Sequence, residues 1–330
     1  MKPHLFKSEN KRLIKKKDTT NHDYGKPPSE RSLTEKIKSG VIIIDKPSGP
    51  TSHQISAWVK NILGIEKAGH SGTLDPNVTG VLPIALNDAV KAIGTFNYGS
   101  KEYVGIARFH KDVEEKKIRN IFAKFVGEIY QTPPVRSAVK RELRKRWIYY
   151  LDILEIENRD VLFRVGCQAG TYIRTLVNDI GLIYGNGAHM QELRRTRVVL
   201  FTEEDAVTLH ELKDAFVAWK EEHNEEELDK IIHPMEAIVE HIPKVVVKDS
   251  AVDALCHGAK LALPGILELD ENISNGSLVA IMTLKGEAVA LGNAVLSSEE
   301  IMEKNDGFAI DMRRVLMTPG TYPSMWKKRK

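Results

Sequence analysis

One loop presents a single carboxylate within a frame of turn-forming residues, HSGTLDPNVTG at positions 70–80. Asp75 precedes Pro76, and a proline keeps the residue before it out of the helical conformation. Gly72 and Gly80 flank the acid and permit a tight loop. A carboxylate held on such a loop can act as a nucleophile or a base. An ordinary Asp-Pro turn, in which the carboxylate bonds its own backbone, fits the same residues, so the loop alone leaves both interpretations open.

A second segment, VGCQAGTYIRTLVNDIG at 165–181, has the order strand, glycine turn and helix. Gly170 or Thr171 is expected to be the N-cap, which puts Arg174 in the first helical turn. The helix N-terminus carries a partial positive charge, so a cation there is unfavourable unless an anion lies beside it. Arg174 could simply extend to water. The other interpretation is that it pairs with a buried carboxylate such as Asp75.

Two tyrosines could serve the same site. Tyr103 lies in the strand-like segment KEYVGIARF, and Tyr172 would stand beside Arg174. A tyrosine on a strand commonly belongs to the core. If Tyr103 instead faces a cleft that holds a carboxylate and an arginine, its ring could stack on a nucleobase and its phenol could relay a proton.

Other kinds of enzyme lack support in the sequence. It contains no phosphate-binding glycine loop of the Walker type, no G-x-G-x-x-G and no H-E-x-x-H. The histidines are scattered, Ser71 does not sit in a nucleophile elbow, and Cys167 and Cys256 form no Cys-x-x-Cys pair. We therefore expect neither a cofactor nor a metal.

The charged residues are distributed unevenly. Residues 1–40 hold 11 Lys/Arg and 5 Asp/Glu, a net of +6, whereas the whole chain carries +3. Further basic runs occur at 135–147 and 194–197, and an acidic block occupies 221–229. The basic N-terminal segment could be a solubilising arm or an arm that contacts phosphates. The clustering as a whole favours a protein that grips a polyanion on one face.

The pattern of apolar residues predicts elements that would carry these side chains. Buried or half-buried strands are expected from alternation and β-branched residues, and helices from apolar stripes with caps. The expected strands are 40–44, 102–109, 150–158 and 160–167, the last two as a hairpin, and the expected helices are 52–64, with Ser52 as N-cap, and 114–127.

The length of 330 residues suggests about two domains. A boundary is expected near 242–247, followed by a short helix at 249–258 and several short strands. These include a hairpin over 277–296 with Lys285 and Gly286 at its turn, which indicates a small β-barrel. No apolar run is long enough for a membrane span and no apolar signal core occurs, so an intracellular location is expected.

At this point the ordered motifs resemble those of TruB-type pseudouridine synthases. They are GVIIIDKPSGPTSH, AGHSGTLDPNVTGVLPIAL, KEYVGIARFHKD, QTPPVRSAVKRELRKR, CQAGTYIRTLVNDIG and GAHMQELRRTR. The stretch from VVVKDSAVDALCHGAKLALPGIL to DMRRVLMTPGTYPSMW resembles the PUA RNA-binding domain. The likeness covers about residues 40–326 and is strongest to the dyskerin branch, the catalytic subunits of H/ACA guide-RNA ribonucleoproteins.

The resemblance implies an α+β fold: a pseudouridine synthase domain with a mixed, mainly antiparallel sheet and flanking helices, plus a small β-barrel PUA domain. It implies three parts. Residues 1–38 form a basic extension that packs on the PUA domain or stays separate, residues 39–245 form the catalytic domain, and residues 246–330 form the PUA domain with a short basic tail. Deleting residues 250–330 is then expected to weaken guide-RNA binding far more than it harms the catalytic fold.

The resemblance also implies roles for the three residues singled out above. Asp75 matches the family's catalytic aspartate, which acts as nucleophile or base. Tyr103 matches the tyrosine that stacks on the target base and takes part in proton transfer. Arg174 matches the arginine that pairs with the aspartate, and a neighbouring guanidinium favours the ionised carboxylate.

Five further residues match positions that the family uses to bind its substrate. His70 matches the histidine that holds the RNA loop with its target base flipped out, and Tyr172 and Leu193 match pocket residues. Lys46 and Pro47 match the first motif, which supports the pocket floor; by themselves they fit an ordinary turn. The basic stretch around residues 130–146 matches a mobile loop that clamps substrate RNA.

The implied activity is isomerisation of specific uridines to pseudouridine in RNA, without a cofactor. Two substrates follow from the resemblance: ribosomal RNA selected by an H/ACA guide RNA, and uridine 55 in the T-loop of tRNA. The implied partners are guide RNA and small accessory proteins, including a kink-turn-binding protein. The ending KKRK lacks the long Lys-rich tail of eukaryotic dyskerins, which favours an archaeal protein in the cytoplasm over a nucleolar one. The alternative function is a non-catalytic RNA-binding scaffold of a ribonucleoprotein, in which Asp75 is only a turn residue.

Overall fold

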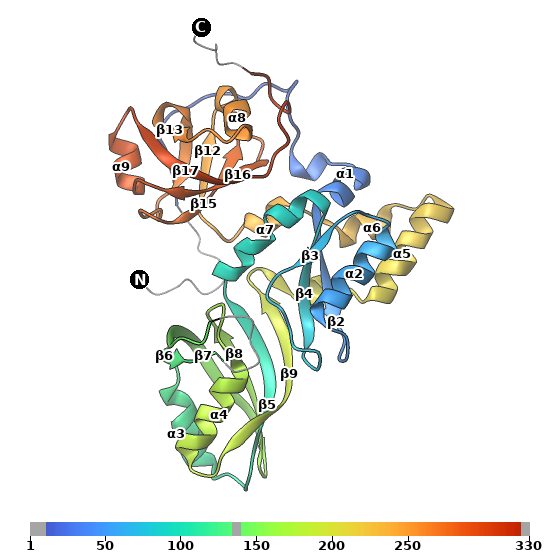
Figure 1. Ribbon diagram of the computed structural model, residues 1–330, viewed down its shortest axis with the longest axis vertical. Coiled ribbons are helices and arrows are strands. Elements are labelled where there is room, and N and C mark those ends of the chain that lie inside the picture. The colour runs from blue at the N-terminus through green and yellow to red at the C-terminus, as the bar shows by residue number, and fades with distance from the viewer. Residues whose placement is uncertain (1–10, 134–139, 325–330) are drawn as a thin grey trace.

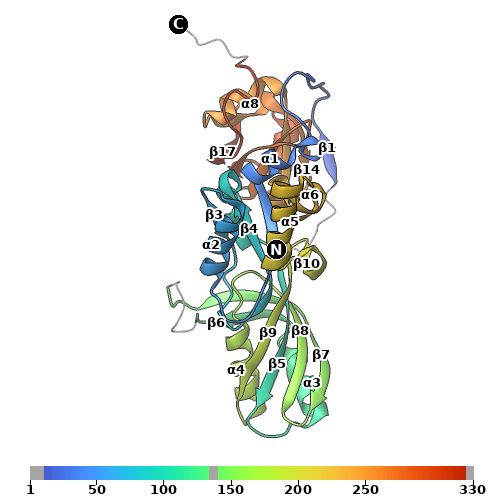
Figure 2. The same ribbon diagram turned by 90° about the vertical axis from the view of Figure 1, so that its right-hand side faces the viewer.

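Two mixed β-sheets organise the molecule, which is elongated, with the smaller sheet at one end (Figures 1 and 2). The computed structural model describes residues 11–133 and 140–324. Helices lie on both sheets, and almost every strand pair is antiparallel. The expected α+β class, with a mainly antiparallel mixed sheet, is confirmed.

The larger sheet holds ten strands. Its main path runs β11-β2-β4-β9-β5-β8-β7-β6, with β10 paired to β9 and β3 paired to β4. Within this sheet β4 and β9 run parallel, which brings the start of β4 beside the end of β9. The strands are β2 (Gly40–Lys46), β3 (Ala68–His70), β4 (Thr79–Leu86), β5 (Lys101–Phe109), β6 (Gly127–Gln131), β7 (Arg144–Glu157), β8 (Asp160–Cys167), β9 (Ala188–Val198), β10 (Phe201–Thr202) and β11 (His233–Pro234).

Strand β2 shows why an unbroken apolar run forms the centre of this sheet. Successive side chains of a strand point to opposite faces. Val41 and Ile43 enter one hydrophobic cluster, and Ile42 and Ile44 enter another. All four are fully buried, because helices or the second sheet cover both faces. The strand ends at Lys46, so that this lysine reaches the edge where the loop of Asp75 lies.

The helices of this part flank the sheet (Figure 1). Helix α2 begins with a capping box in which Thr51 is the N-cap and Gln54 the reciprocating residue, and it ends at Gly64 in the left-handed conformation. The expected N-cap, Ser52, is therefore wrong by one residue, because the hydroxyl of Ser52 is used elsewhere. The helices are α1 (Leu33–Lys38), α2 (Ser52–Leu63), α3 (Glu115–Lys124), α4 (Ile173–Tyr184), α5 (Leu209–Glu222), α6 (Glu226–Ile231) and α7 (Glu236–Val239).

The smaller sheet has the order β1-β14-β12-β15-β16-β17-β13. The expected hairpin is confirmed: β15 and β16 pair antiparallel, and Gly286 between them has φ +81°. All of β12 belongs to this sheet, so the sheet change precedes Lys244 and the expected boundary after residue 245 falls inside a strand. The elements are β1 (Arg12–Ile14), β12 (Lys244–Val247), α8 (Asp249–Cys256), β13 (Leu261–Ala262), β14 (Ile266–Asp270), β15 (Leu278–Thr283), β16 (Ala288–Ala294), α9 (Ser298–Glu303) and β17 (Phe308–Val315).

The N-terminal segment contacts both sheets. Strand β1 pairs with β14 at the edge of the smaller sheet. Arg31 then forms two hydrogen bonds, of 2.7 and 2.8 Å, with the carboxylate of Glu236. The same carboxylate accepts the backbone N–H of Ala288 in β16 at 2.9 Å. The partly buried Glu236 carboxylate therefore joins this segment, helix α7 and strand β16 of the smaller sheet.

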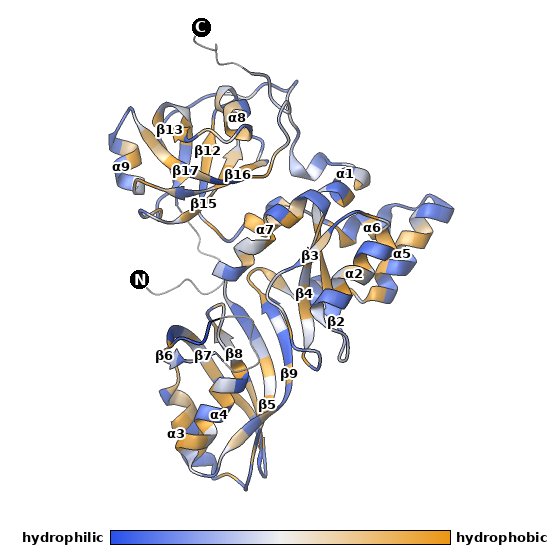
Figure 3. Ribbon diagram, in the orientation of Figure 1, coloured by the Kyte–Doolittle hydropathy of each residue, from blue (hydrophilic) through white to orange (hydrophobic). Residues whose placement is uncertain are grey.

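A single hydrophobic cluster also joins the two sheets. Val41 and Phe96, from the part of the chain around the larger sheet, share it with Ala280, Met282 and Leu291 from the smaller one. Figure 3 shows apolar residues on many of the strands and a mixture of apolar and polar residues on the helices, whereas β9 is largely hydrophilic. Removing residues 250–330 would expose this cluster, so the structure argues against the expectation that such a deletion spares the catalytic fold. Among the helices that the structure describes, none has the length and apolarity that crossing a membrane requires.

Candidate active site

The side chain of Asp75, in the loop between β3 and β4, forms an ion pair with Arg174. Arg174 Nε lies 3.1 Å from Asp75 Oδ2, and the two side chains remain 43% and 48% exposed. The structure thus brings together the two residues that the sequence suggested as a pair. The expected burial of the carboxylate is wrong, because nearly half of the Asp75 side chain is exposed.

The start of α4 places Arg174. Its N-cap is Tyr172, in place of the expected Gly170 or Thr171. The side chain of Gln131 accepts the N–H of Tyr172 at 3.0 Å and donates to its carbonyl at 3.1 Å. No side chain caps the helix and no acid lies in its first turn, so its amide groups and the Arg174 guanidinium both favour an anion here. Asp75 supplies that anion from another part of the chain.

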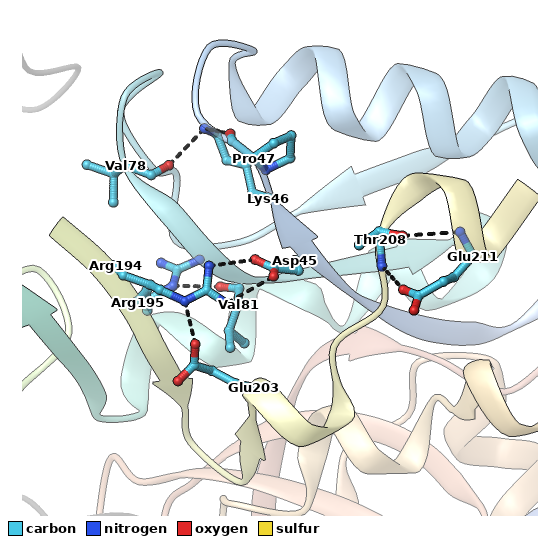
Figure 4. A network of polar contacts seen from close by, with 10 residues as sticks. All are labelled: Asp45, Lys46, Pro47, Val78, Val81, Arg194, Arg195, Glu203, Thr208 and Glu211. Carbon is cyan, nitrogen blue, oxygen red and sulfur yellow. Dashed lines mark hydrogen bonds and ion pairs between the residues drawn. The ribbon is translucent and has the colours of Figure 1, made fainter. Parts of the chain in front are cut away.

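The loop of Asp75 is held on both sides of the acid. Ser52 Oγ donates to Leu74 O at 3.2 Å and accepts from Leu74 N at 3.0 Å. The fully buried Lys46 donates from Nζ to the carbonyls of Pro47, Pro76 and Val78 at 2.8–2.9 Å. Figure 4 shows Lys46 with Pro47 and Val78. The residues immediately before and after Asp75 are therefore both tied to neighbouring elements.

The structure places Lys46 against the loop of Asp75. Its ammonium group has its three donors on backbone carbonyls, and the side chain is fully buried. Burial lowers the pKa of Lys46, and the Asp75 carboxylate opposes the shift. Pro47 is exposed at the end of β2. The role of both residues as support of the pocket floor stays a prediction.

Arg195 clamps the two ends of the same loop, and sequence reasoning missed it. Its Nε donates to Val81 O at 2.8 Å (Figure 4), and its Nη1 donates to Gly72 O at 2.6 Å. The backbone of Gly80 passes so close that a Cβ there would lie 2.2 Å from Arg195 O. Residues two apart on a strand point to the same face, so Arg195 faces the same side of β9 as the buried Leu193. This alternation was the signal that could have predicted the burial of Arg195.

The RRTR run at 194–197 is consequently no free basic patch. Arg195 is 1% exposed. Arg194 pairs with both oxygens of Asp45 at 2.9 Å and also with Glu203 (Figure 4). Arg197 donates to the carbonyl of Val199 at 2.9 Å. The contribution of this run to a polyanion-binding face stays a prediction and falls to Arg194 and Arg197, which are partly exposed, because Arg195 is buried.

Tyr103 faces the same side of the sheet as Arg195. The two are partners across β5 and β9 at a bulge, where Tyr103 pairs with Arg195 and the preceding residue pairs with Arg197. A bulge of this kind re-aims the side chains next to it. The ring packs on the hydrophobic cluster that also contains Leu193, which is buried opposite Gly105. Burial raises the pKa of the Tyr103 phenol, and the Arg195 guanidinium opposes that rise.

His70 ends β3 five residues before the acid. Its Nδ1 lies 2.9 Å from Ser56 Oγ and its Nε2 lies 3.2 Å from Thr73 Oγ1. The ring of His53 meets it edge-on, with 4.7 Å between the ring centres. Burial, with smaller effects of His53 and Arg195, lowers the pKa of His70 to about 4. His70 is therefore neutral near pH 7 and presents a ring rather than a charge.

The basic stretch at 130–146 is described only at its two ends. Residues 134–139 lie outside the described part of the chain. At the C-terminal end, Arg146 Nε donates to Gly170 O at 2.9 Å, so the start of β7 packs on the glycine turn before α4. Lys145 pairs with Glu128 at 3.0 Å. Within the described residues there is no group of three or more His, Cys, Asp or Glu side chains that could hold a metal ion.

The sequence matches known families along nearly its whole length. Residues 60–173 match the TruB family pseudouridylate synthase (N terminal domain), and residues 174–240 match the tRNA pseudouridylate synthase B C-terminal domain. Residues 243–316 match the PUA domain, and residues 2–56 match the DKCLD (NUC011) domain.

Individual relatives give the same picture. The probable tRNA pseudouridine synthase B of Methanopyrus kandleri is 56% identical over 321 residues, which cover 97% of this chain and 95% of the relative. That of Pyrococcus furiosus is 54% identical, with 96% and 94% covered. A chain solved in a Cbf5-Nop10-Gar1 complex superposes with a TM-score of 0.93 at 54% identity, covering 96% of this chain and 97% of that one. A chain of an H/ACA RNP bound to a substrate RNA containing 2'-deoxyuridine gives 0.91 at 51% identity, covering 97% and 98%.

The fold and these matches define an enzyme that isomerises uridine to pseudouridine in RNA. The chain belongs to the TruB family of pseudouridylate synthases and carries a PUA domain. The resemblance seen in the sequence is thereby confirmed. The individual roles of the site residues stay predictions.

Proposed function

We propose that this chain is the catalytic subunit of an archaeal H/ACA ribonucleoprotein, modifying uridines of ribosomal RNA chosen by a guide RNA. We further propose that it acts on uridine 55 in the T-loop of tRNA. The structures with accessory proteins and with substrate RNA support the first activity, and the tRNA synthases among the relatives support the second. Small accessory proteins, including a kink-turn-binding protein, would complete the particle in the archaeal cytoplasm.

The proposed chemistry centres on the Asp75–Arg174 pair, and this observation carries the proposal. The target uridine first leaves its stack, at a cost of a few kcal/mol. Asp75 then acts as nucleophile or base while the C1′–N1 bond breaks. The uracil turns and C1′ bonds to C5, whose proton is lost as N1 gains one. No atom and no electron is added in total, so the reaction needs no redox partner.

The surrounding residues have proposed parts in this reaction. Tyr103 stacks on the uracil and relays the proton, and Arg174 holds Asp75 and balances its charge. Tyr172 and Leu193 shape the pocket. His70, as a neutral ring, contacts the RNA strand beside the flipped base. Lys46 and Pro47, the remaining members of the proposed site, fix the loop from below.

A division of labour between the parts of the chain is also proposed. Residues 39–243 perform the isomerisation, and the smaller sheet from residue 244 onward binds RNA as PUA domains do, an assignment that the match over 243–316 supports. The extension up to residue 38, whose strand β1 completes the smaller sheet, sets the orientation of the two.

Substitution of Asp75 by Asn tests the chemistry. The amide is close in size to the carboxylate but cannot attack or take a proton, so D75N should fold, bind RNA within about twofold of the parent, and form no pseudouridine. The measurement is pseudouridine formation under single turnover, with RNA affinity measured separately. Activity close to that of the parent chain would exclude this mechanism.

A side-by-side assay tests the choice of substrate. A tRNA transcript and a ribosomal RNA fragment are each offered with and without the matching guide RNA and accessory proteins. The proposal expects guide-dependent modification of the ribosomal fragment and guide-independent modification of the tRNA. Equal modification of the ribosomal fragment without guide would reject the guided activity.

A further inference from the structure

Arg195 is a guanidinium buried without an ion pair. It is 1% exposed, and among the described residues no carboxylate forms an ion pair with it. Two of its nitrogens donate to Gly72 O and Val81 O, the two ends of the Asp75 loop. The third, Nη2, is buried and has no acceptor in good hydrogen-bond geometry in the described structure, although the guanidinium already interacts with the Tyr103 phenol closely enough to lower the pKa of that phenol. Burying a charged donor without an acceptor is costly, so its retention calls for an explanation.

The side chain beside this free donor is Tyr103. The two residues are directly opposite at the β5–β9 bulge, an arrangement that puts neighbouring side chains about 5 Å apart at Cβ. Burial raises the pKa of Tyr103 and the Arg195 guanidinium lowers it, so the phenol oxygen lies within the field of that guanidinium. Arg195 thus touches the loop of the proposed nucleophile and stands next to the proposed proton relay.

We propose that Arg195 is a positioning residue for the isomerisation, and that it fixes the Asp75 loop with Nε and Nη1 while Nη2 donates to the Tyr103 phenol when a uridine stacks on that ring. This inference rests on the proposed roles of Asp75 and Tyr103. The planar Arg195 side chain then sets the distance between the Asp75 carboxylate and the Tyr103 phenol, which lie on either side of the uracil base. A guanidinium suits this task because its donors form a rigid planar fork.

The other groups that face Tyr103 cannot replace Arg195. Cys167, which pairs with Lys101 across β5 and β8, stays a neutral thiol because burial raises its pKa to about 12. Lys101 lies on the same strand as Tyr103, and its ammonium group donates to the carbonyls of Phe96 and Gly99. Its side chain lies close to Gly72. Asp75 carries a negative charge and would oppose a phenolate. Arg195 is therefore the group placed to hold the phenol oxygen as its proton leaves.

The test is a double-mutant cycle on Arg195 and Tyr103. Arg195→Lys keeps a cation but cannot reach the two loop carbonyls and the phenol together. On the RNA for which D75N abolishes product, R195K should slow single-turnover pseudouridine formation about tenfold to a hundredfold with RNA affinity within about twofold. In a Tyr103→Phe background the same change should cost much less, because the acceptor is gone.

The matched control is Arg194→Lys, which alters the neighbouring guanidinium that pairs with Asp45 and Glu203, and it should keep the parent rate. The inference would be overturned if R195K had the same rate as the parent chain. It would also be overturned if R195K reduced the rate by the same factor in the parent chain and in the Y103F background. A loss confined to RNA binding would have the same consequence. A fully active Y103F variant would instead reject the proposed role of Tyr103.

A second variant acts on the same guanidinium without replacing Arg195 itself. A Cβ on Gly72 would lie 3.0 Å from Arg195 Nη1, at a backbone φ of +66°. Gly72→Ala should therefore shift Arg195 and reduce the rate in the same direction, with RNA binding retained. If R195K does not fold, G72A provides the test in its place. A G72A rate close to that of the parent chain would then contradict the proposal.

Discussion

Arg174 Nε lies 3.1 Å from Asp75 Oδ2, and this contact joins the first turn of α4 to the loop between β3 and β4. The two residues are 99 positions apart in the chain. Both side chains are nearly half exposed, so their attraction adds little to folding. We propose that its value lies in aligning the carboxylate for an incoming base.

Replacing Arg174 by Met should separate activity from stability. The free energy of unfolding in urea is expected to change by less than about 1 kcal/mol, as for an exposed pair. The single-turnover rate should fall about a hundredfold, because the partner of the reacting charge is lost. Arg119→Met is the control: Arg119 pairs with Glu115 at 2.8 Å on the surface of α3, and its loss should leave the rate unchanged.

Replacing Ser52 by Ala should loosen the loop from the helix side. The change leaves the buried N–H and C=O of Leu74 without their partner, at a cost of about 1–3 kcal/mol in unfolding free energy. Activity should decline as well, since Leu74 precedes the acid. Ser48→Ala, at an exposed position of the preceding connection, should change neither quantity; a harmless S52A would show that the loop is fixed without Ser52.

Two glycines with similar backbone angles allow a test of the contact with Arg195. Gly80 has φ +100° and Gly49 has φ +111°, but only at Gly80 would a Cβ meet other atoms, with Arg195 O at 2.2 Å. Alanine at either position carries the left-handed cost of about 1–2 kcal/mol. G80A should lose roughly 1–3 kcal/mol more than G49A because of overpacking. Equal unfolding free energies would mean that the strands separate easily at this point.

The protonation of His70 should make stability depend on pH on the acid side. Its pKa is about 4 in the folded protein and 6.5 in an exposed chain, so the unfolded state binds more protons between these values. The free energy of unfolding should therefore fall as the pH drops from 6.5 towards 4. Burial also lowers the pKa of His241 to about 4, and it acts in the same window.

An NMR titration checks this assignment. The ring resonance of His70, identified by its loss in His70→Gln, should titrate near pH 4, and H70Q should reduce the slope of stability against pH. A midpoint near 6.5 would show that the ring is open to water. A combined H70Q/H241Q chain should lose more of the slope than either single variant.

Removal of residues 250–330 should damage the whole fold. Ala280, Met282 and Leu291 share a hydrophobic cluster with Val41 and Phe96, so the truncated chain would expose part of its core. Thermal unfolding of the truncated chain should be broad or absent. A cooperative transition close to that of the full chain would show that the larger sheet folds independently and would restore the simpler deletion test of RNA binding.

The local order of the chain could be read from the sequence to a large extent. The expected helices over 52–64 and 114–127 correspond to α2 and α3, and the expected hairpins correspond to β7–β8 and β15–β16. Periodicity and turn residues suffice here, because these features depend on neighbouring residues. The exact caps did not follow, since Ser52 could bond either its own helix or a distant loop.

The sequence by itself determined the motifs, hence the family, and it indicated that Asp75 sits on a stiff loop and that Arg174 needs an anion. Tertiary structure decided what the other polar residues do. Lys46 and Arg195 looked like members of a turn and of a basic patch, and both are buried donors that hold the carboxylate loop. Burial and hydrogen-bond partners depend on which strands pair, and the register at the β5–β9 bulge, which sets Arg195 beside Tyr103, is fixed only when distant segments come together.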